Sequence, residues 1–268
     1  LLYNIVDRIY IGHISGVGAA ALTGVGLFTP ILMLINAFAM LAGSGGAPRA
    51  AISMGKKDNK TAEKILGNCF ALLILMAVIL TVVFFTFAPQ LLTLFGASEK
   101  TLPYGVAYAR IYILGSIFVL IVMGMNPFIT TQGFAKISMM TTVIGAVINI
   151  ILDPIFIFVF HLGVKGAALA TVLSQAVGAI WILRFLSGKK TILHLKKENF
   201  KLQKEIILPC LALGISTFVM LSTESILSIS FTSSLSRYGG DLAVGAMTII
   251  TSVSQLATLP LQLSLIHI

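Results

Sequence analysis

The chain is built from long apolar runs, each close to the length that crosses a lipid bilayer. A spanning helix needs about 20 mostly apolar residues, because it rises 1.5 Å per residue through a hydrocarbon core about 30 Å thick. Such runs occupy about 19–42, 65–89, 104–125, 137–160, 166–186 and 206–231, with partial runs at 1–13 and from 241 onwards. The sequence therefore predicts an all-α polytopic membrane protein.

Composition supports a lipid environment. Of the 268 residues, 57% are hydrophobic and 10% are charged, whereas soluble chains carry roughly 25% charged residues. That much apolar surface cannot be buried in one globular core, so we expect no nucleic-acid partner despite the net charge of +9. The two cysteines, Cys69 and Cys210, lie in or beside apolar runs and are predicted to be packing residues, without a disulfide or a metal.

The distribution of cations predicts the orientation, since basic residues gather in cytoplasmic loops. If residues 43–64 form a cytoplasmic loop, strict alternation places 13 of the 18 cations on that side. They are Arg49, Lys56, Lys57, Lys60, Lys64, Lys136, Arg184, Lys189, Lys190, Lys196, Lys197, Lys201 and Lys204. We therefore predict a multi-pass plasma-membrane protein with loops 43–64 and 187–205 in the cytoplasm. Both ends lie inside apolar runs, so we expect a fragment whose missing amino terminus is also cytoplasmic.

A weak internal repeat indicates two lobes. Residues 15–24 match residues 236–245 at Ser, Gly and Gly, and each copy is expected in a short outer loop that leads into the next helix. An even number of helices between the copies preserves orientation, as in parallel transporter repeats. We therefore predict an amino-terminal lobe at 1–186, a basic inter-lobe loop at 187–205 and the start of a second lobe at 206–268.

Three acids fall in the apolar runs, namely Asp7, Asp153 and Glu224. A charge in a spanning segment costs at least about 2.5 to 3.5 kcal/mol, so it is normally functional. Asn149 stands four residues before Asp153, which puts both on one helical stripe. Pro154 follows directly and is predicted to kink the helix, because a proline frees the carbonyl four residues earlier.

Depth brings some of these residues together. Asp7 lies six residues before His13, Asp153 eight before His161, and Thr171 six after Lys165. At 1.5 Å per residue, all three lie roughly 9 to 12 Å below the outer surface. Two carboxylates, an amide and a hydroxyl at one level suit a proton or a small hard cation such as Na⁺.

Each of these residues also has a structural interpretation. Asp7 would then pair with Arg8 at the interface, and Asp153 would satisfy the backbone around the Pro154 kink. Thr171 would be a packed helix hydroxyl. Glu224 would hydrogen-bond across helices, although it is also a candidate for a second-lobe site.

Several stretches together resemble the multidrug and toxic compound extrusion (MATE) transporters. The stretches are 4–7, 11–13, 20–22, 43–46, 50–58, 131–133 with Lys136, 149–156 and 163–171, and the most specific reads Asn-Ile-Ile-Leu-Asp-Pro-Ile-Phe at 149–156. The resemblance implies a drug/Na⁺ or drug/H⁺ antiporter with two six-helix lobes and alternating access. It also implies coupling through Asp7, Asn149, Asp153 and Thr171, with Glu224 contributing in some members.

The resulting prediction is cation-coupled efflux of small, often cationic compounds by a monomer, with no cofactor beyond the coupling ion. The nearest alternative is a related flippase of lipid-linked precursors, which would need a basic cavity for pyrophosphate. From a different class, a membrane enzyme would need a nucleophile–base or metal pair, and a non-transporting receptor is the remaining alternative. The sequence shows no such catalytic pair, so no enzyme is predicted.

Overall fold

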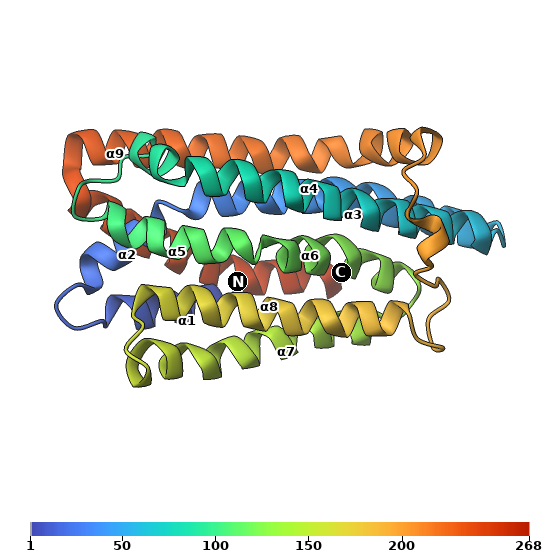
Figure 1. Cartoon of the computed structure of the whole chain (residues 1–268), viewed down its shortest axis with the longest axis horizontal. Helices are drawn as coiled ribbons and strands as arrows, with labels where there is room; N and C mark the ends of the chain where they lie inside the picture. The colour runs from blue at the N-terminus through green and yellow to red at the C-terminus, as the bar shows by residue number, and fades with distance from the viewer. Residues whose placement is uncertain (1, 268) are drawn as a thin grey trace.

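The computed structural model describes the backbone of residues 2–267 and the side chains of residues 5–254, and every regular element in that part is helical. The helices lie side by side along the long axis of the molecule (Figure 1). They are α1 (Leu2–Gly12), α2 (Gly18–Gly26), α3 (Thr29–Gly55), α4 (Asn59–Leu94), α5 (Leu102–Leu114), α6 (Ser116–Thr131), α7 (Ala135–Pro154), the π-helix η1 (Ile155–Val159), α8 (Val164–Leu186), the 3₁₀-helix η2 (Lys197–Phe200) and α9 (Lys204–His267).

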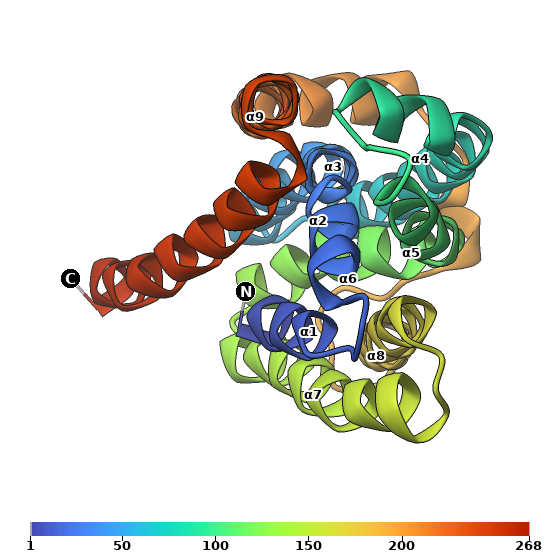
Figure 2. The same ribbon diagram turned by 90° about the vertical axis from the view of Figure 1, so that its left-hand side faces the viewer.

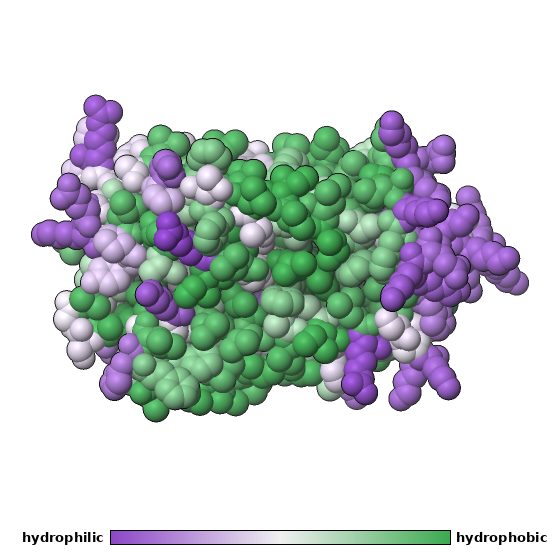
Figure 3. Space-filling view, in the orientation of Figure 1, coloured by the Kyte–Doolittle hydropathy of each residue, from purple (hydrophilic) through white to green (hydrophobic). Residues whose placement is uncertain are grey.

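The surface carries an apolar belt between two polar ends (Figure 3). Side chains such as Ile79 and Val82 are 52% and 61% exposed within this belt. Five helical segments of the described chain are long and apolar enough to cross a membrane, or six if the bent pair α5–α6 counts as one span. The expected all-α polytopic membrane fold is therefore confirmed, with lipid as the solvent of the belt.

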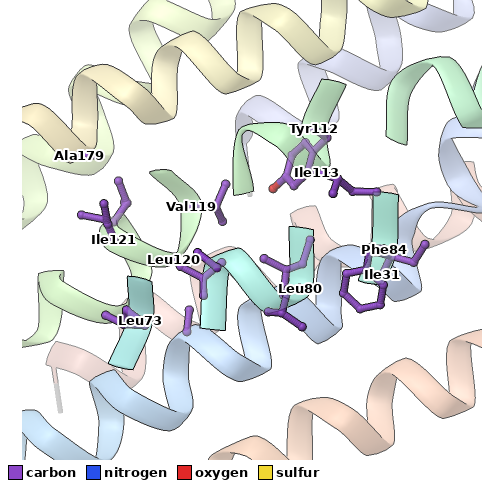
Figure 4. Close-up of a cluster of buried hydrophobic side chains, with 14 of the residues drawn as sticks. Ile31, Leu73, Leu80, Phe84, Tyr112, Ile113, Val119, Leu120, Ile121 and Ala179 are labelled. Atoms are coloured by element: carbon purple, nitrogen blue, oxygen red, sulfur yellow. The ribbon is translucent and has the colours of Figure 1, made fainter. Parts of the chain in front are cut away.

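The core lies where α3, α4, α5, α6 and α8 meet. Ile31, Leu80, Ile113 and Leu120 converge from four of these helices (Figure 4), and each is at most 7% exposed. Association of helices in lipid depends on close packing rather than on exclusion of water, so interlocking side chains of this kind hold the bundle together. Cys69 and Cys210 are both buried and free, as packing residues would be.

The predicted loop at residues 43–64 is wrong for most of its length. Helix α3 continues to Gly55, only Lys56–Asp58 form the turn, and α4 begins at Asn59. The glycines that suggested a loop instead allow close helix packing. A Cβ on Gly45 would overlap the carbonyl of Cys210 in α9, so α3 and α9 touch through backbone at this point.

Two other expected boundaries differ. The run predicted as one helix at 104–125 is two segments, α5 and α6, bent by 56° around Gly115, and α6 extends to Thr131. In the second copy of the repeat, the expected loop is reduced to a sharp break between two helices that share the label α9. The break lies at Gly240, whose φ of 67° favours glycine. This one-residue break sends the chain back along the bundle (Figures 1 and 2).

The loops form two ends of unequal charge. One end carries the α3–α4 and α6–α7 turns and the long connection from α8 to α9, and the opposite end carries the α1–α2, α4–α5 and α7–α8 connections (Figure 1). The first end is densely hydrophilic in Figure 3. This agrees with the alternation that predicted the cytoplasmic side, and the orientation itself stays a prediction.

The connection at residues 187–203, here called the strap, is fixed to the bundle by three buried side chains, the strap cluster Glu63, Asn68 and Gln132. Gln132 Oε1 accepts hydrogen bonds from Thr191 Oγ1 at 2.8 Å and from the backbone N–H groups of residues 192 and 193, both at 2.9 Å. The basic segment predicted to join two lobes is therefore an ordered part of the structure.

The other two members of the strap cluster act from α4. Asn68 Oδ1 accepts from the Gln203 N–H at 2.7 Å, and Asn68 Nδ2 donates to the Asn199 carbonyl at 3.1 Å. Glu63 accepts from Lys196 Nζ at 2.7 Å and from the backbone N–H of residue 194 at 3.2 Å. Side chains on α4 and α6–α7 thus hold the strap at both of its ends.

Candidate ion-binding site

Asn149 joins Asp153 and Thr171 inside the bundle. Its Nδ2 donates to Asp153 Oδ1 and to Thr171 Oγ1, both at 3.3 Å. Asn149 and Asp153 are fully buried, and Thr171 is 2% exposed. Three of the four predicted coupling residues therefore form one hydrogen-bonded group between α7 and α8, called the carboxylate cluster together with Asp7.

Local helix geometry produces this arrangement. Asn149 and Asp153 are one turn apart on α7, and Thr171 lies on the facing side of α8, where its hydroxyl also donates to the Ala167 carbonyl at 3.1 Å. The α-helix ends at Pro154 and continues as the π-helix η1. Because proline has no N–H, the regular ladder is interrupted immediately beside Asp153.

Asp7 reaches the same region from α1. It is 3% exposed, and its Oδ2 accepts a hydrogen bond of 3.5 Å from the hydroxyl of Tyr108 on α5. Asp7 and Asp153 are near enough to interact electrostatically. Helix α1 also contacts α7 and α8. The carboxyl ends of α1 and α7 and the amino end of α8 lie at the same end of the molecule (Figure 1). Asp7 therefore lies at the level of Asp153, as its distance from the end of its helix indicated.

The cluster contains three buried oxygen atoms without a hydrogen-bond partner among the described residues. They are Asp7 Oδ1, Asn149 Oδ1 and Asp153 Oδ2. The amide nitrogen of Asn149 already faces the carboxylate, so its carbonyl oxygen must point elsewhere. A buried acceptor without a donor costs about 1 to 3 kcal/mol. A region rich in acceptors and poor in donors is what a cation or a proton would satisfy.

A hard cation would depend on the amide and the hydroxyl as well as on the acids. No group of three or more His, Cys, Asp and Glu side chains is placed to hold a metal within the part of the chain that the structure describes. Two carboxylates, one amide and one hydroxyl supply only oxygen ligands, which suit Na⁺ rather than a softer metal.

Asp7 also borders a cavity of about 240 Å³ between α1, α3 and α9. Asn36, with a buried unpartnered Oδ1, and Glu224 line it as well. Glu224 is exposed on α9 and is absent from the hydrogen-bonded group around Asn149. The structure thus places the predicted second-lobe acid at the cavity wall.

Arg8 does not act as the salt-bridge partner of Asp7. It donates to Ser252 Oγ at 2.8 Å and to Thr29 Oγ1 at 3.1 Å, and no ion pair joins it to Asp7 among the described side chains. Asp7 is thus buried rather than interfacial, and its relation to Arg8 is a longer-range electrostatic interaction, not a direct ion pair. Through Ser252, Arg8 connects α1 with the part of α9 that follows the break at Gly240.

Tyr108 and Asn36 are site residues that the sequence did not suggest. Tyr108 belongs to a stripe of tyrosines at 104, 108 and 112, spaced four apart on one face of α5. That periodicity was an available signal. Asn36 is a lone amide in an apolar run, and it lines the same cavity as Asp7 because of a tertiary arrangement that no local pattern indicates.

The fold and these buried polar groups define a class, the multi-pass helical membrane proteins that keep acids inside the bundle. The family model MatE matches residues 1–155, which is more than half of the chain, so the chain belongs to the MATE family. The multidrug export protein MepA of Staphylococcus haemolyticus is 28% identical over 239 residues, covering 89% of this chain and 52% of MepA. The predicted family is therefore confirmed.

Solved structures agree with the family. An inward-facing MATE family multidrug resistance transporter of the MOP superfamily matches with a TM-score of 0.90 and 29% identity, over 97% of this chain and 58% of its own. The MATE multidrug transporter DinF-BH, solved in complex with a ligand, matches with a TM-score of 0.90 and 32% identity, over the same shares. The chain thus spans a little over half the length of the relatives that it matches.

Proposed function

We propose that this chain serves in the export of small, often cationic organic compounds, exchanged for Na⁺ or H⁺ by alternating access. The names of its relatives support multidrug export rather than enzyme catalysis. The further proposal, that export is ion-coupled, is supported by the carboxylate cluster. We expect the transporter to work as a monomer in the plasma membrane, with the drug and the coupling ion as its substrates.

The observation that carries the coupling proposal is the pattern of open acceptors. Among the described residues, no group donates to one buried oxygen on each of Asp7, Asn149 and Asp153. A single proton or Na⁺ bound there would supply the missing positive charge, and its release would restore the need for a cation. Binding of an ion and of a cationic drug near Asp7 would then compete, which is the requirement for exchange.

Flippase activity on a lipid-linked precursor is disfavoured by charge. A pyrophosphate needs several cations in the cavity. The cavity beside Asp7 contains two acids, Asp7 and Glu224, and one base, Arg8. At their ordinary charges these three groups sum to −1, which favours a cationic cargo over a phosphorylated one.

The experiment is ion-driven dye efflux by the full-length transporter in proteoliposomes. Asp7→Asn and Asp153→Asn each keep the side-chain shape and remove one acid. Each is expected to reduce ion-driven efflux roughly 5- to 150-fold, which corresponds to the usual coupling free energy of about 1 to 3 kcal/mol between two binding sites. The double variant is expected to be scarcely worse than either single variant, because residues that act as a unit are not additive.

The matched control is Glu224→Gln, which removes an acid from the same cavity but not from the hydrogen-bonded group. It is expected to alter efflux less than Asp153→Asn does. Parent-level efflux with parent ion dependence in both aspartate variants would refute coupling at this cluster. Loss of ion dependence in Glu224→Gln alone would transfer the coupling role to α9.

A further inference from the structure

A groove of about 1050 Å³ opens at the end of the molecule opposite the strap. Its walls come from α5, from the start of α8, from the α7–α8 link and from the α1–α2 connection. Figure 2 views the molecule from this end, and α5 and α8 lie close to one another there. The groove is separate from the carboxylate cluster, none of whose members lines it.

The groove gathers cations that the predicted orientation leaves on the far side. Arg110 and Lys165 belong to the five cations outside the cytoplasmic set, and both are exposed and line the groove. His161 lines it too. No carboxylate of the described chain is among the lining residues. The described lining therefore carries positive charge and no carboxylate.

Arg110 is unusual in its depth. It lies eight residues after the start of α5, so roughly 12 Å from the end of that helix. Its guanidinium lies 5.8 Å from the centre of the Phe85 ring on α4. A charge facing lipid at such a depth costs several kcal/mol unless it extends to the interface or meets an anion. Figure 3 shows hydrophilic side chains interrupting the apolar belt over α5 and the start of α8.

Apart from Tyr104, the remaining lining is apolar. Val106 and Ile111 on α5, Pro89 on α4 and Leu162 in the α7–α8 link form a surface that continues from the cations. A ligand that suits this groove has an anionic head and a hydrocarbon body. Guanidinium groups bind phosphate with two parallel hydrogen bonds, and lysine adds a point charge.

We propose that this groove binds an anionic phospholipid of the leaflet opposite the strap. Its phosphate lies between Arg110 and Lys165, and one acyl chain lies against Val106 and Ile111. The lipid satisfies the charge of Arg110 at the edge of the belt. It also links α5 to the start of α8, beside the short connection between the helices that carry Asp153 and Thr171.

The test is retention of phosphatidylglycerol, compared with phosphatidylcholine, by the purified full-length protein in native mass spectrometry. The parent is expected to retain phosphatidylglycerol preferentially. The double variant Arg110→Gln/Lys165→Gln is expected to lose roughly 30-fold in relative affinity, since each basic residue near a lipid surface contributes about 1 kcal/mol. The double variant Lys189→Gln/Lys190→Gln removes the same charge from the strap and is expected to keep the preference.

Two further measurements distinguish a lipid site from a misfolded variant and from a site for free phosphate. The exchange variant Arg110→Lys/Lys165→Arg keeps both charges and is expected to keep the preference, which guards against a merely misfolded glutamine variant. Inorganic phosphate alone is expected not to raise the unfolding temperature. A rise in unfolding temperature with inorganic phosphate alone would show a free-anion site. Equal retention of phosphatidylglycerol by the parent and by the Arg110→Gln/Lys165→Gln variant would show that the groove is not a lipid site. Either result overturns the proposal.

Discussion

The carboxylate cluster and the strap cluster are both buried and polar, yet they differ in how their oxygens are paired. In the strap cluster, Glu63 accepts through both carboxylate oxygens, and the amide oxygens of Asn68 and Gln132 also accept. In the carboxylate cluster, Asp7, Asn149 and Asp153 each keep an oxygen to which no side chain or backbone group of the described part of the chain donates. The two clusters thus contain similar carboxylate and amide oxygens, which accept hydrogen bonds in the strap cluster and are partly unpaired in the carboxylate cluster.

The difference teaches how to separate structural from functional polar groups within one membrane protein. A fully satisfied network rigidifies its surroundings, and any change to it leaves a buried group unpaired. An unsatisfied group reduces stability by about 1 to 3 kcal/mol, so its presence calls for an explanation such as a bound ion. We therefore expect changes in the strap cluster to alter stability and changes in the carboxylate cluster to alter coupling.

The largest expected effect concerns the sides of the membrane on which the two ends lie. A cysteine at Lys197 in the strap should react only with a reagent applied from the cytoplasm, and one at Lys100, in the α4–α5 connection, only from outside. The native Cys69 and Cys210 are buried, so the background should be low. The measurement is labelling of intact cells and of inverted vesicles, and labelling of Lys197→Cys from outside would reverse the orientation.

A matched pair of asparagines tests the comparison directly, since Asn68 and Asn149 are both fully buried. Asn149→Ala is expected to lower ion-driven efflux per folded molecule roughly 5- to 150-fold, in addition to any loss of stability from removing the donor of Asp153 Oδ1. Asn68→Ala is expected to cost about 1 to 3 kcal/mol of stability, because the Gln203 N–H loses its acceptor. Efflux per folded molecule should stay at the parent level, and the reverse pattern would break the comparison.

The next effect is expected at Gln132, whose one oxygen accepts three hydrogen bonds. Gln132→Ala removes all three and is expected to destabilise the protein by about 2 kcal/mol. Gln132→Glu retains an acceptor oxygen and serves as the control, with a smaller expected loss. Thermal unfolding in detergent measures both. Equal losses in the two variants would mean that helix packing around Gln132, and not the strap, sets its contribution.

The smallest effect is expected at Lys196, and it concerns pH. The hydrogen bond and charge of Glu63 raise the pKa of Lys196 above its usual value. A raised lysine pKa gives stabilisation that is complete below the unfolded pKa of about 10.4 and is lost only as pH rises through the folded value. The stability difference between the parent and Lys196→Gln should therefore be constant from about pH 6 to pH 9.

Unfolding temperatures at several pH values check this. A difference that changes within this pH range would show that the Lys196–Glu63 pair does not account for the stability difference.

Local patterns predicted the parts of the molecule that local physics determines. Apolar runs of bilayer length indicated the helices, and a spacing of four placed Asn149 beside Asp153. Counting residues from the helix ends brought Thr171 and Asp7 to the same level. The role of these residues in coupling stays a prediction, and so do the boundaries of the two lobes.

Long-range packing was beyond such patterns. The glycines at 43–46 suggested a loop, because a close approach between α3 and α9 leaves no mark in the sequence of either helix. The bend at Gly115 also lay inside a continuous apolar run. The strap partners of Gln132 are 59 to 61 residues away, and those of Asn68 are 131 to 135 residues away. Only the fold reveals that residues 187–203 are fixed.

The strap also has a consequence for biogenesis. Asn68 and Glu63 leave the ribosome 131 to 135 residues before their partners in the strap. At about 5 to 20 residues per second, these polar side chains wait roughly 10 s for the chain that covers them. A nascent chain halted before residue 191 would expose all three members of the strap cluster at the membrane surface. Docking of the strap would thus mark the moment at which the preceding helices cease to be a target for chaperones and proteases.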